Sequence, residues 1–241
     1  MDYDKIYYNF PIAIYRQVRC DNKGRIEHVE DAINDSIRYA LYVEYQKRLP
    51  YRSNVNELNE VVFDCFMDEM GFTTESREAS LKNWAAAFKK YKNYVVFVGV
   101  DRELLFNFRD DLEYKSDFEI IQLLAFIAIR SIIGAGQSNT RYKHIKWCYV
   151  LSRMAGHEKT VKDLDKLPKF IAKYNSRRLR DKLIKALCDR WHMQYYGTNL
   201  GKGNAPLFSF SPDIDLVSIV EREKARKKGQ NGPIGNEMDV Q

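Results

Sequence analysis

The sequence predicts a mainly α-helical fold with a small β-hairpin close to its C-terminal end. Along most of the chain, apolar residues recur every three or four positions, which is the spacing of amphipathic helices. Over residues 195–210, two short β-prone runs flank a glycine-rich segment, which is typical of a hairpin. Positive charge is also concentrated, because the excess of Lys and Arg falls within residues 141–192. We therefore expect a helical protein with one strongly basic part.

Three helices are predicted in the first half of the chain. Their apolar stripes run over residues 29–45, 58–70 and 81–91. Pro50 and Gly71 are the stop signals that follow the first two stripes.

Shorter elements are predicted on either side of these helices. The apolar run 11–18 indicates a strand or an extended arm. The run 94–100 is β-branched and aromatic and predicts a strand, which leads into a helix over 101–109. The polar stretch 110–116 follows and is the predicted junction between two halves.

This junction gives three predicted parts. Residues 1–115 are a helical N-terminal region, residues 116–228 are a C-terminal domain, and residues 229–241 are a disordered tail because they contain little to bury. Within the C-terminal domain, residues 118–133 are apolar nearly all round, which predicts a buried helix.

The remaining helices of the C-terminal domain are predicted from caps and stops. Thr140 is the expected cap of a helix that closes at Gly156, and residues 167–174 form a short helix. Asp213 is the expected cap of a last helix that extends to residue 228.

A basic helix is predicted from the N-cap Ser176 to Trp191. Leu179, Leu183 and Leu187 recur every four residues and give this helix an apolar face. The opposite face carries three cations, which are Arg178, Lys182 and Lys185.

A hairpin follows the basic helix. Tyr195 and Tyr196 begin it, residues 197–203 form its glycine-rich tip, and residues 207–210 return. Together, the helix and hairpin resemble the recognition helix and wing of winged helix-turn-helix DNA-binding domains, over residues 116–228. The resemblance implies nucleic-acid binding, although winged helices also serve as protein-interaction and dimerisation modules.

Charge gives an independent argument. Residues 1–140 carry 18 Lys and Arg against 22 Asp and Glu, a net charge of −4. Residues 141–192 carry 15 against 5, a net charge of +10, and residues 193–241 carry 6 against 6. A polyanion such as nucleic acid would be attracted to the basic block. The alternative is a solvated helix face, because Arg177 and Asp181 are spaced as an ordinary i, i+4 pair.

The resemblance places six residues at a duplex DNA interface. With the basic helix in the major groove, its exposed cations would lie nearest bases or phosphates, its first-turn arginines would contact phosphates, and a wing lysine would meet the backbone or minor groove. The exposed cations are Arg178, Lys182 and Lys185, the arginines at the helix start are Arg177 and Arg180, and the wing lysine is Lys202.

Composition bounds the location of the protein. The four cysteines are 40 or more residues apart along the chain, so neither a zinc knuckle nor a compact disulfide framework is expected. The N-terminal segment lacks the apolar core of a secretory signal, and the apolar stretch 120–133 is too short to span a bilayer. We expect a cytoplasmic protein without a membrane partner.

No catalytic motif is complete, so we expect no enzyme, no cofactor and no metal. Gly197, Gly201 and Lys202 lack the spacing and the strand-to-helix context of a phosphate loop. His144 and Cys148 share an i, i+4 spacing, with His157 nearby, but no fourth metal ligand is evident.

A metal-dependent nuclease is a further alternative. Asp101, Glu113 and Lys115 contain the acid and Glu-x-Lys elements that such enzymes use to hold a divalent ion. These residues are not predicted on adjoining strands, so surface charges are the simpler interpretation.

The main alternative function is a protein-interaction or assembly module. In that case residues 1–115 would bind a protein partner. An exposed apolar patch over residues 29–92, together with scattered basic residues in the C-terminal domain, would favour this alternative.

Overall fold

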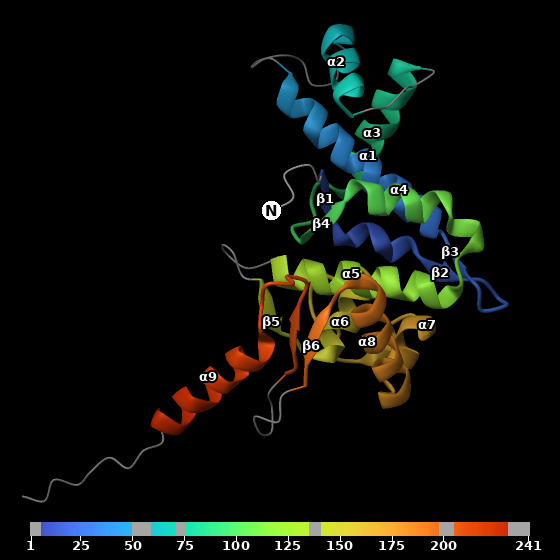
Figure 1. Cartoon of the computed structure of the whole chain (residues 1–241). Helices are drawn as coiled ribbons and strands as arrows, with labels where there is room; N and C mark the ends of the chain where they lie inside the picture. Colours follow the sequence, from blue (N-terminus) through green and yellow to red (C-terminus); the bar gives the residue numbers. More distant parts are fainter. Residues whose placement is uncertain (1–5, 50–58, 71–75, 135–140, 198–204, 231–241) are drawn as a thin grey trace, which may run out of the picture.

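Helices dominate the structure, which is a computed structural model, and small antiparallel sheets accompany them (Figure 1). The structure describes residues 6–49, 59–70, 76–134, 141–197 and 205–230. The prediction of a mainly α-helical fold is therefore confirmed.

A two-stranded antiparallel sheet lies beside the helices of the first half. Strand β1 (Tyr7–Pro11) pairs with β4 (Phe97–Asp101), so segments 90 residues apart in sequence are hydrogen-bonded. After β1 come the 3₁₀ helix η1 (Ile12–Gln17) and a hairpin of β2 (Arg19–Cys20) and β3 (Ile26–Glu27). The helices are α1 (Val29–Arg48), α2 (Glu60–Met70), α3 (Arg77–Tyr91) and α4 (Arg102–Asp110).

The predicted helices of this half are confirmed to within a few residues, and so is the strand before α4. Both stop signals, Pro50 and Gly71, lie outside the described residues. The expectation for residues 11–18 is wrong in part, because the strand ends at Pro11 and residues 12–17 form η1. The side chains of residues 12–15 are all buried, so burial on every side produced an apolar run without strand pairing.

Aromatic side chains fill the space between α1, α2 and α3. The rings of Phe63 and Trp84 stack with centroids 5.3 Å apart, and Tyr45 packs against both. Such ring pairs stabilise a core beyond the area that they bury.

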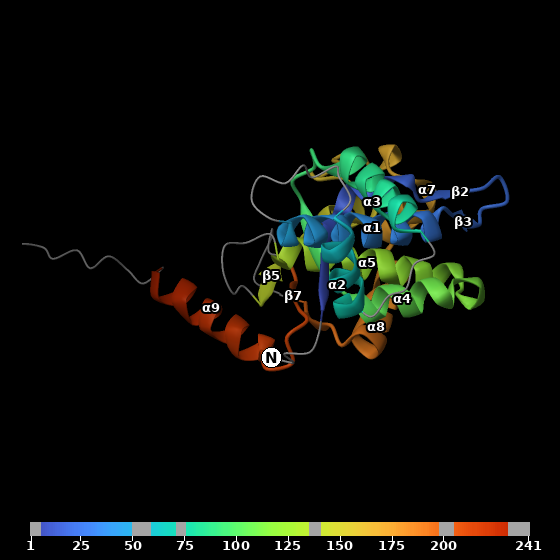
Figure 2. The same ribbon diagram turned by 90° about the horizontal axis from the view of Figure 1, so that it is seen from above.

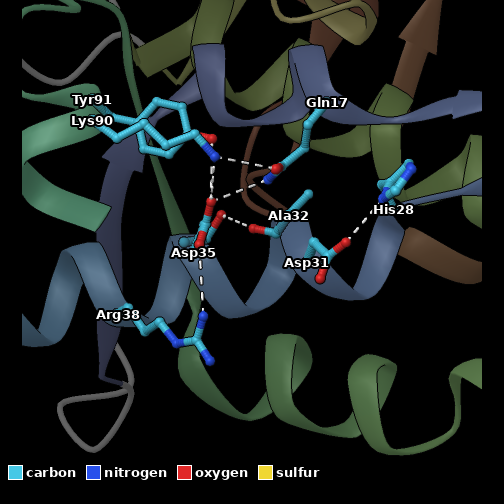
Figure 3. Close-up of polar contacts among 9 residues, drawn as sticks. Gln17, His28, Asp31, Ala32, Asp35, Arg38, Lys90 and Tyr91 are labelled. Atoms are coloured by element: carbon cyan, nitrogen blue, oxygen red, sulfur yellow. Dashed lines mark hydrogen bonds and ion pairs between the residues drawn. The ribbon is translucent and has the colours of Figure 1, made fainter. Parts of the chain in front are cut away.

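Asp35 of α1 is the centre of a polar network that joins α1 to η1 and α3 (Figure 3). Its Oδ2 accepts hydrogen bonds from Gln17 Nε2 at 3.3 Å, Lys90 Nζ at 3.2 Å and the Tyr91 hydroxyl at 3.2 Å. Arg38 lies 3.8 Å from Oδ1. Because only 16% of the Asp35 side chain is exposed, these donors replace most of its water.

Helix α5 (Asp117–Gly134) is buried by both halves of the chain. The side chains of residues 120–129 are all buried, as predicted for this segment. On one side α5 packs against β4 and η1, and on the other against α6 and α8 (Figure 1). One hydrophobic core contains residues of both halves. A shared core does not test where a domain boundary lies, and the boundary at residue 116 stays a prediction.

The rest of the chain follows below α5 in Figure 1. Strands β5 (Tyr142–His144), β6 (Gln194–Tyr196) and β7 (Leu207–Ser209) form an antiparallel sheet in the order β5-β7-β6, with Phe208 between Lys143 and Tyr195. The helices are α6 (Trp147–Met154), η3 (Leu164–Lys166), α7 (Lys169–Ala172), η4 (Lys173–Asn175), α8 (Arg177–Trp191) and α9 (Leu216–Gln230).

Two helix predictions here need correction. The helix expected after Thr140 begins only at Trp147, because residues 142–144 form β5; Thr140 itself lies outside the described residues. Strand β5 has three residues and pairs with β7, 65 residues further along the chain at Lys143 and Phe208, so the local sequence carries no pattern that would predict it. The single helix expected over 167–174 is divided into α7 and η4.

The predicted cap of the last helix is also wrong. Asp215, and not Asp213, accepts hydrogen bonds from the backbone N–H groups of Val217 and Ser218. These bonds and the Ser218 hydroxyl lower the Asp215 pKa. Asp213 instead forms an ion pair with Arg141.

Helix α9 extends away from the body of the molecule (Figures 1 and 2). Its start packs through Leu216, Ile219 and Val220 against Leu207. Helix α9 ends at Gln230, two residues beyond its predicted end, and residues 231–241, most of the predicted tail, lie outside the described part. Within the described part of the chain, none of the helices combines the length and the apolar character that a membrane crossing requires.

We predict that Asp35→Asn destabilises the protein by about 1–2 kcal/mol, because the variant loses a charged acceptor shared by three donors. Urea unfolding measures the change. The matched control is Asp31→Asn on the same helix, whose carboxylate is exposed and pairs with His28, so its cost should stay below about 1 kcal/mol. Equal costs for the two variants would show that the network adds nothing.

Candidate nucleic-acid interface

Helix α8 has the bounds that the sequence predicted, with Ser176 at the N-cap. The Ser176 carbonyl accepts the Arg180 backbone N–H at 3.0 Å, while its side chain makes no capping bond. Leu183 and Leu187 are fully buried, which confirms the apolar face. At the end of the helix, Trp191 donates through Nε1 to Gln122 Oε1 of α5 at 3.1 Å.

The opposite face of α8 carries three exposed cations, as predicted. Arg178, Lys182 and Lys185 point to solvent, and none of them forms an ion pair with another described residue. Lys182 has one intramolecular contact, since its Nζ lies 4.6 Å from the ring centroid of Phe118 on α5. The solvent face of α8 therefore presents charge that the protein does not neutralise.

Two of the three arginines in the first turn of α8 are partly neutralised. Arg177 Nε lies 3.6 Å from one Asp181 oxygen, and Arg180 Nε lies 3.7 Å from the other. The i, i+4 pair expected for Arg177 is thus present, and one carboxylate serves two arginines. Arg177 has 89% of its side chain exposed and Arg180 only 34%, so Arg180 is the more constrained. Lys202, the sixth predicted contact, lies outside the described residues.

A groove of about 380 Å³ separates α8 from the hairpin. Arg180 lines it from α8, Tyr195 from β6, and Lys146 from the segment before α6. Burial raises the Tyr195 pKa, and the positive charge of Arg180 opposes that shift. An anion in this groove would meet two cations and a phenol hydroxyl.

Sequence reasoning missed Lys146 as a member of this groove. The sequence places Lys146 in the helix expected after Thr140, beside the apolar face of that helix, with no indication that it lies near the hairpin. The pairing of β5 with β7 places Lys146 beside the hairpin, and the neighbouring Ile145 N–H donates to the Pro206 carbonyl at 3.0 Å.

The candidate metal ligands do not form a cluster. His144 lies on β5, with Nδ1 2.7 Å from the Ala205 carbonyl oxygen and Nε2 3.0 Å from Glu223 of α9. Among the described residues, no group of three His, Cys, Asp or Glu side chains could hold a metal ion.

The acids considered for a nuclease have local roles. Asp101 is the N-cap of α4, where Oδ1 accepts the Glu103 backbone N–H at 2.8 Å. Glu113 lies on the exposed 3₁₀ turn η2 (Leu112–Tyr114). A hydrogen bond between the Glu113 carboxylate and the Tyr114 hydroxyl raises the Tyr114 pKa. Most of the glycine-rich segment compared with a phosphate loop, including Gly201, lies outside the described residues.

Comparison of the chain with protein-family models, with curated proteins and with solved structures finds no match. The interface is therefore argued from its own residues.

The start of α5 positions α8 through a capping box. Ser116 and Glu119 exchange bonds, with the Ser116 backbone N–H donating to Glu119 Oε2 at 3.1 Å and the Glu119 N–H donating to Ser116 Oγ at 3.3 Å. The other Glu119 oxygen lies 3.6 Å from Arg190 of α8. The backbone bond, the Ser116 hydroxyl, Lys115 and Arg190 lower the Glu119 pKa.

We predict a pH-dependent effect of Glu119→Gln. Because the folded-state pKa is lowered, the carboxylate contributes stability above its unfolded pKa of about 4.3, and this is lost as the pH falls through the folded pKa. The variant should be less stable by up to about 1 kcal/mol at pH 7, and the difference should vanish in acid. Urea unfolding from pH 7 to pH 3 measures it.

The matched control is Glu78→Gln, an exposed glutamate in the first turn of α3. Its effect should be smaller than that of Glu119→Gln at pH 7. A Glu119 variant whose deficit is the same at pH 7 and pH 3 would contradict the assignment of this charge.

Proposed function

We propose that residues 116–228 form a winged helix-turn-helix and that the protein binds double-stranded DNA, without catalysis, through α8 and the hairpin β6–β7. The observation that carries this proposal is the order of elements. The buried helix α5, the short strand β5, the helices α6 and α7 with the 3₁₀ helices η3 and η4, the basic helix α8 and the hairpin β6–β7 follow one another. Strand β5 pairs with β7 and so completes the hairpin sheet. In that arrangement α8 occupies the position of a recognition helix, and the hairpin that of a wing.

The charges of α8 suit a duplex. An α-helix fits the major groove, which is about 12 Å wide, and three exposed cations lie on the face that would enter it. Each cation that neutralises a phosphate releases condensed counterions, so binding gains free energy and becomes dependent on salt. The groove with Lys146 and Arg180 extends the positive surface toward the hairpin.

A protein-interaction module is supported less well. Within the described part of residues 29–92, Val61 is the large apolar side chain that is exposed, at 74%, which does not make a patch. Of the cations of the C-terminal part, Arg178, Lys182 and Lys185 share the solvent face of α8, and Lys146 and Arg180 line the adjoining groove. Both observations favour DNA over a protein partner for this surface.

We predict that the full chain binds an arbitrary 25-base-pair DNA duplex, with fluorescence anisotropy as the measurement. Four to six phosphate contacts should give a slope of roughly −4 to −5 for log affinity against log salt. Lys182→Ala and Lys185→Ala should each weaken binding about equally for all sequences and reduce the slope by about 1. The control is Lys82→Ala on α3, which should change neither quantity. Absence of binding at low salt would overturn the proposal.

A separate prediction concerns Arg178, which is exposed in the first turn of α8. If Arg178 reads a base edge, Arg178→Ala should relax the preference at one base-pair position by about 1–3 kcal/mol. Selection of bound duplexes from a randomised pool, for wild type and variant, measures this preference. Identical selected sequences would show that Arg178 contacts only the backbone.

A further inference from the structure

The β2–β3 hairpin and α7 lie side by side (Figures 1 and 2). A second basic groove lies between them. It has a volume of about 740 Å³. Arg16, Arg19 and Asp21 line it from the N-terminal half, and Lys169 and Lys173 line it from the C-terminal half. The two halves of the chain therefore build this surface together.

The hairpin is a basic segment within an acidic half. Residues 1–140 have a net charge of −4, yet residues 16–25 contain four Lys and Arg and one acid, Asp21. Asp21 is occupied inside the turn, because Oδ1 accepts the backbone N–H groups of Lys23 and Arg25, each at 2.8 Å. Its other oxygen, Oδ2, lies 3.8 Å from Arg25 Nε, so the carboxylate closes the turn and forms its ion pair within the hairpin.

Three cations of the groove have no carboxylate partner. Arg19, Lys169 and Lys173 are exposed, and none of them forms an ion pair with another described residue. Arg16 is held differently, since Nε donates to the Gly156 carbonyl at 3.1 Å and a terminal nitrogen donates to the Tyr94 hydroxyl at 3.2 Å. Arg16 therefore positions the wall, and the other three can meet an anion.

The groove continues the surface of α8. Lys173 precedes Arg177 by four residues, so their Cα atoms lie within about 14 Å of each other. Phe118, which contacts Lys182, stacks against Tyr174 with ring centroids 6.5 Å apart. Lys169, Lys173 and Arg177 therefore follow one another at four-residue intervals from α7 through η4 to the start of α8, and the first two line the groove opposite the hairpin.

We propose that this groove binds the sugar–phosphate backbone of the same duplex, beside the contacts of α8. This inference rests on the proposed function. Each strand of a duplex carries one charge per about 3.4 Å of axis, so a backbone that leaves α8 brings successive phosphates to Lys173, Lys169 and Arg19. Residues of the N-terminal half, such as Arg19, then contribute to DNA affinity directly. This role differs from the protein-binding role that the alternative function gives to residues 1–115.

The test uses the full chain, a 25-base-pair duplex and a salt titration followed by anisotropy. Arg19→Ala and Lys173→Ala should each lower affinity about fivefold near 0.15 M salt and reduce the slope by about 1, and the double variant by about 2. Arg19→Lys should retain the wild-type slope, because the charge remains. Far-UV circular dichroism and thermal unfolding verify that each variant is folded.

The control is Lys23→Ala, which removes the same charge from the same hairpin outside the groove. Its slope should stay that of the wild type, and a fall equal to that of Arg19→Ala would overturn the groove assignment. If the wild type binds and Lys182→Ala weakens binding while the double groove variant does not, the groove inference alone fails. If the wild type does not bind DNA, the proposed function itself fails.

Discussion

Burial of α5 is the constraint on which the rest of the structure depends. Four side chains of α5 contact α8. Phe118 lies under Lys182, and Glu119 faces Arg190. Gln122 accepts a hydrogen bond from Trp191 Nε1, and Phe126 packs against the Trp191 ring with centroids 4.7 Å apart. From its other end, Arg130 Nε donates to the Gly99 carbonyl of β4 at 3.0 Å. A helix that is apolar on nearly all sides can lose its contact with water only if both halves cover it.

A glycine sets the second contact between the halves. Gly156 ends α6 with a φ of +73°, and a Cβ at this position would lie 2.8 Å from the Arg16 backbone nitrogen. Because Arg16 lines the second basic groove, this close approach lies at the wall of that groove. A residue with a Cβ could not take the place of Gly156 without a shift of Arg16.

The positive surface is assembled from segments of unequal charge. Most of it comes from residues 141–192, but Arg19 belongs to a half with a net charge of −4. Self-repulsion among the cations is acceptable because they are exposed and water and salt screen them. The same exposure leaves them available to phosphates, so one arrangement serves both stability and the proposed binding.

By itself, the sequence determined the elements whose signals are local. The stripes of α1, α2, α3 and α8, the N-cap Ser176, the buried character of α5 and the exposure of Arg178, Lys182 and Lys185 all follow from helical periodicity. Tertiary structure alone decided where β5 pairs, why Lys146 faces the hairpin, and that Arg19 lies across a groove from Lys173. These features depend on contacts between residues 60 to 150 positions apart, and such contacts form only when the halves pack around α5.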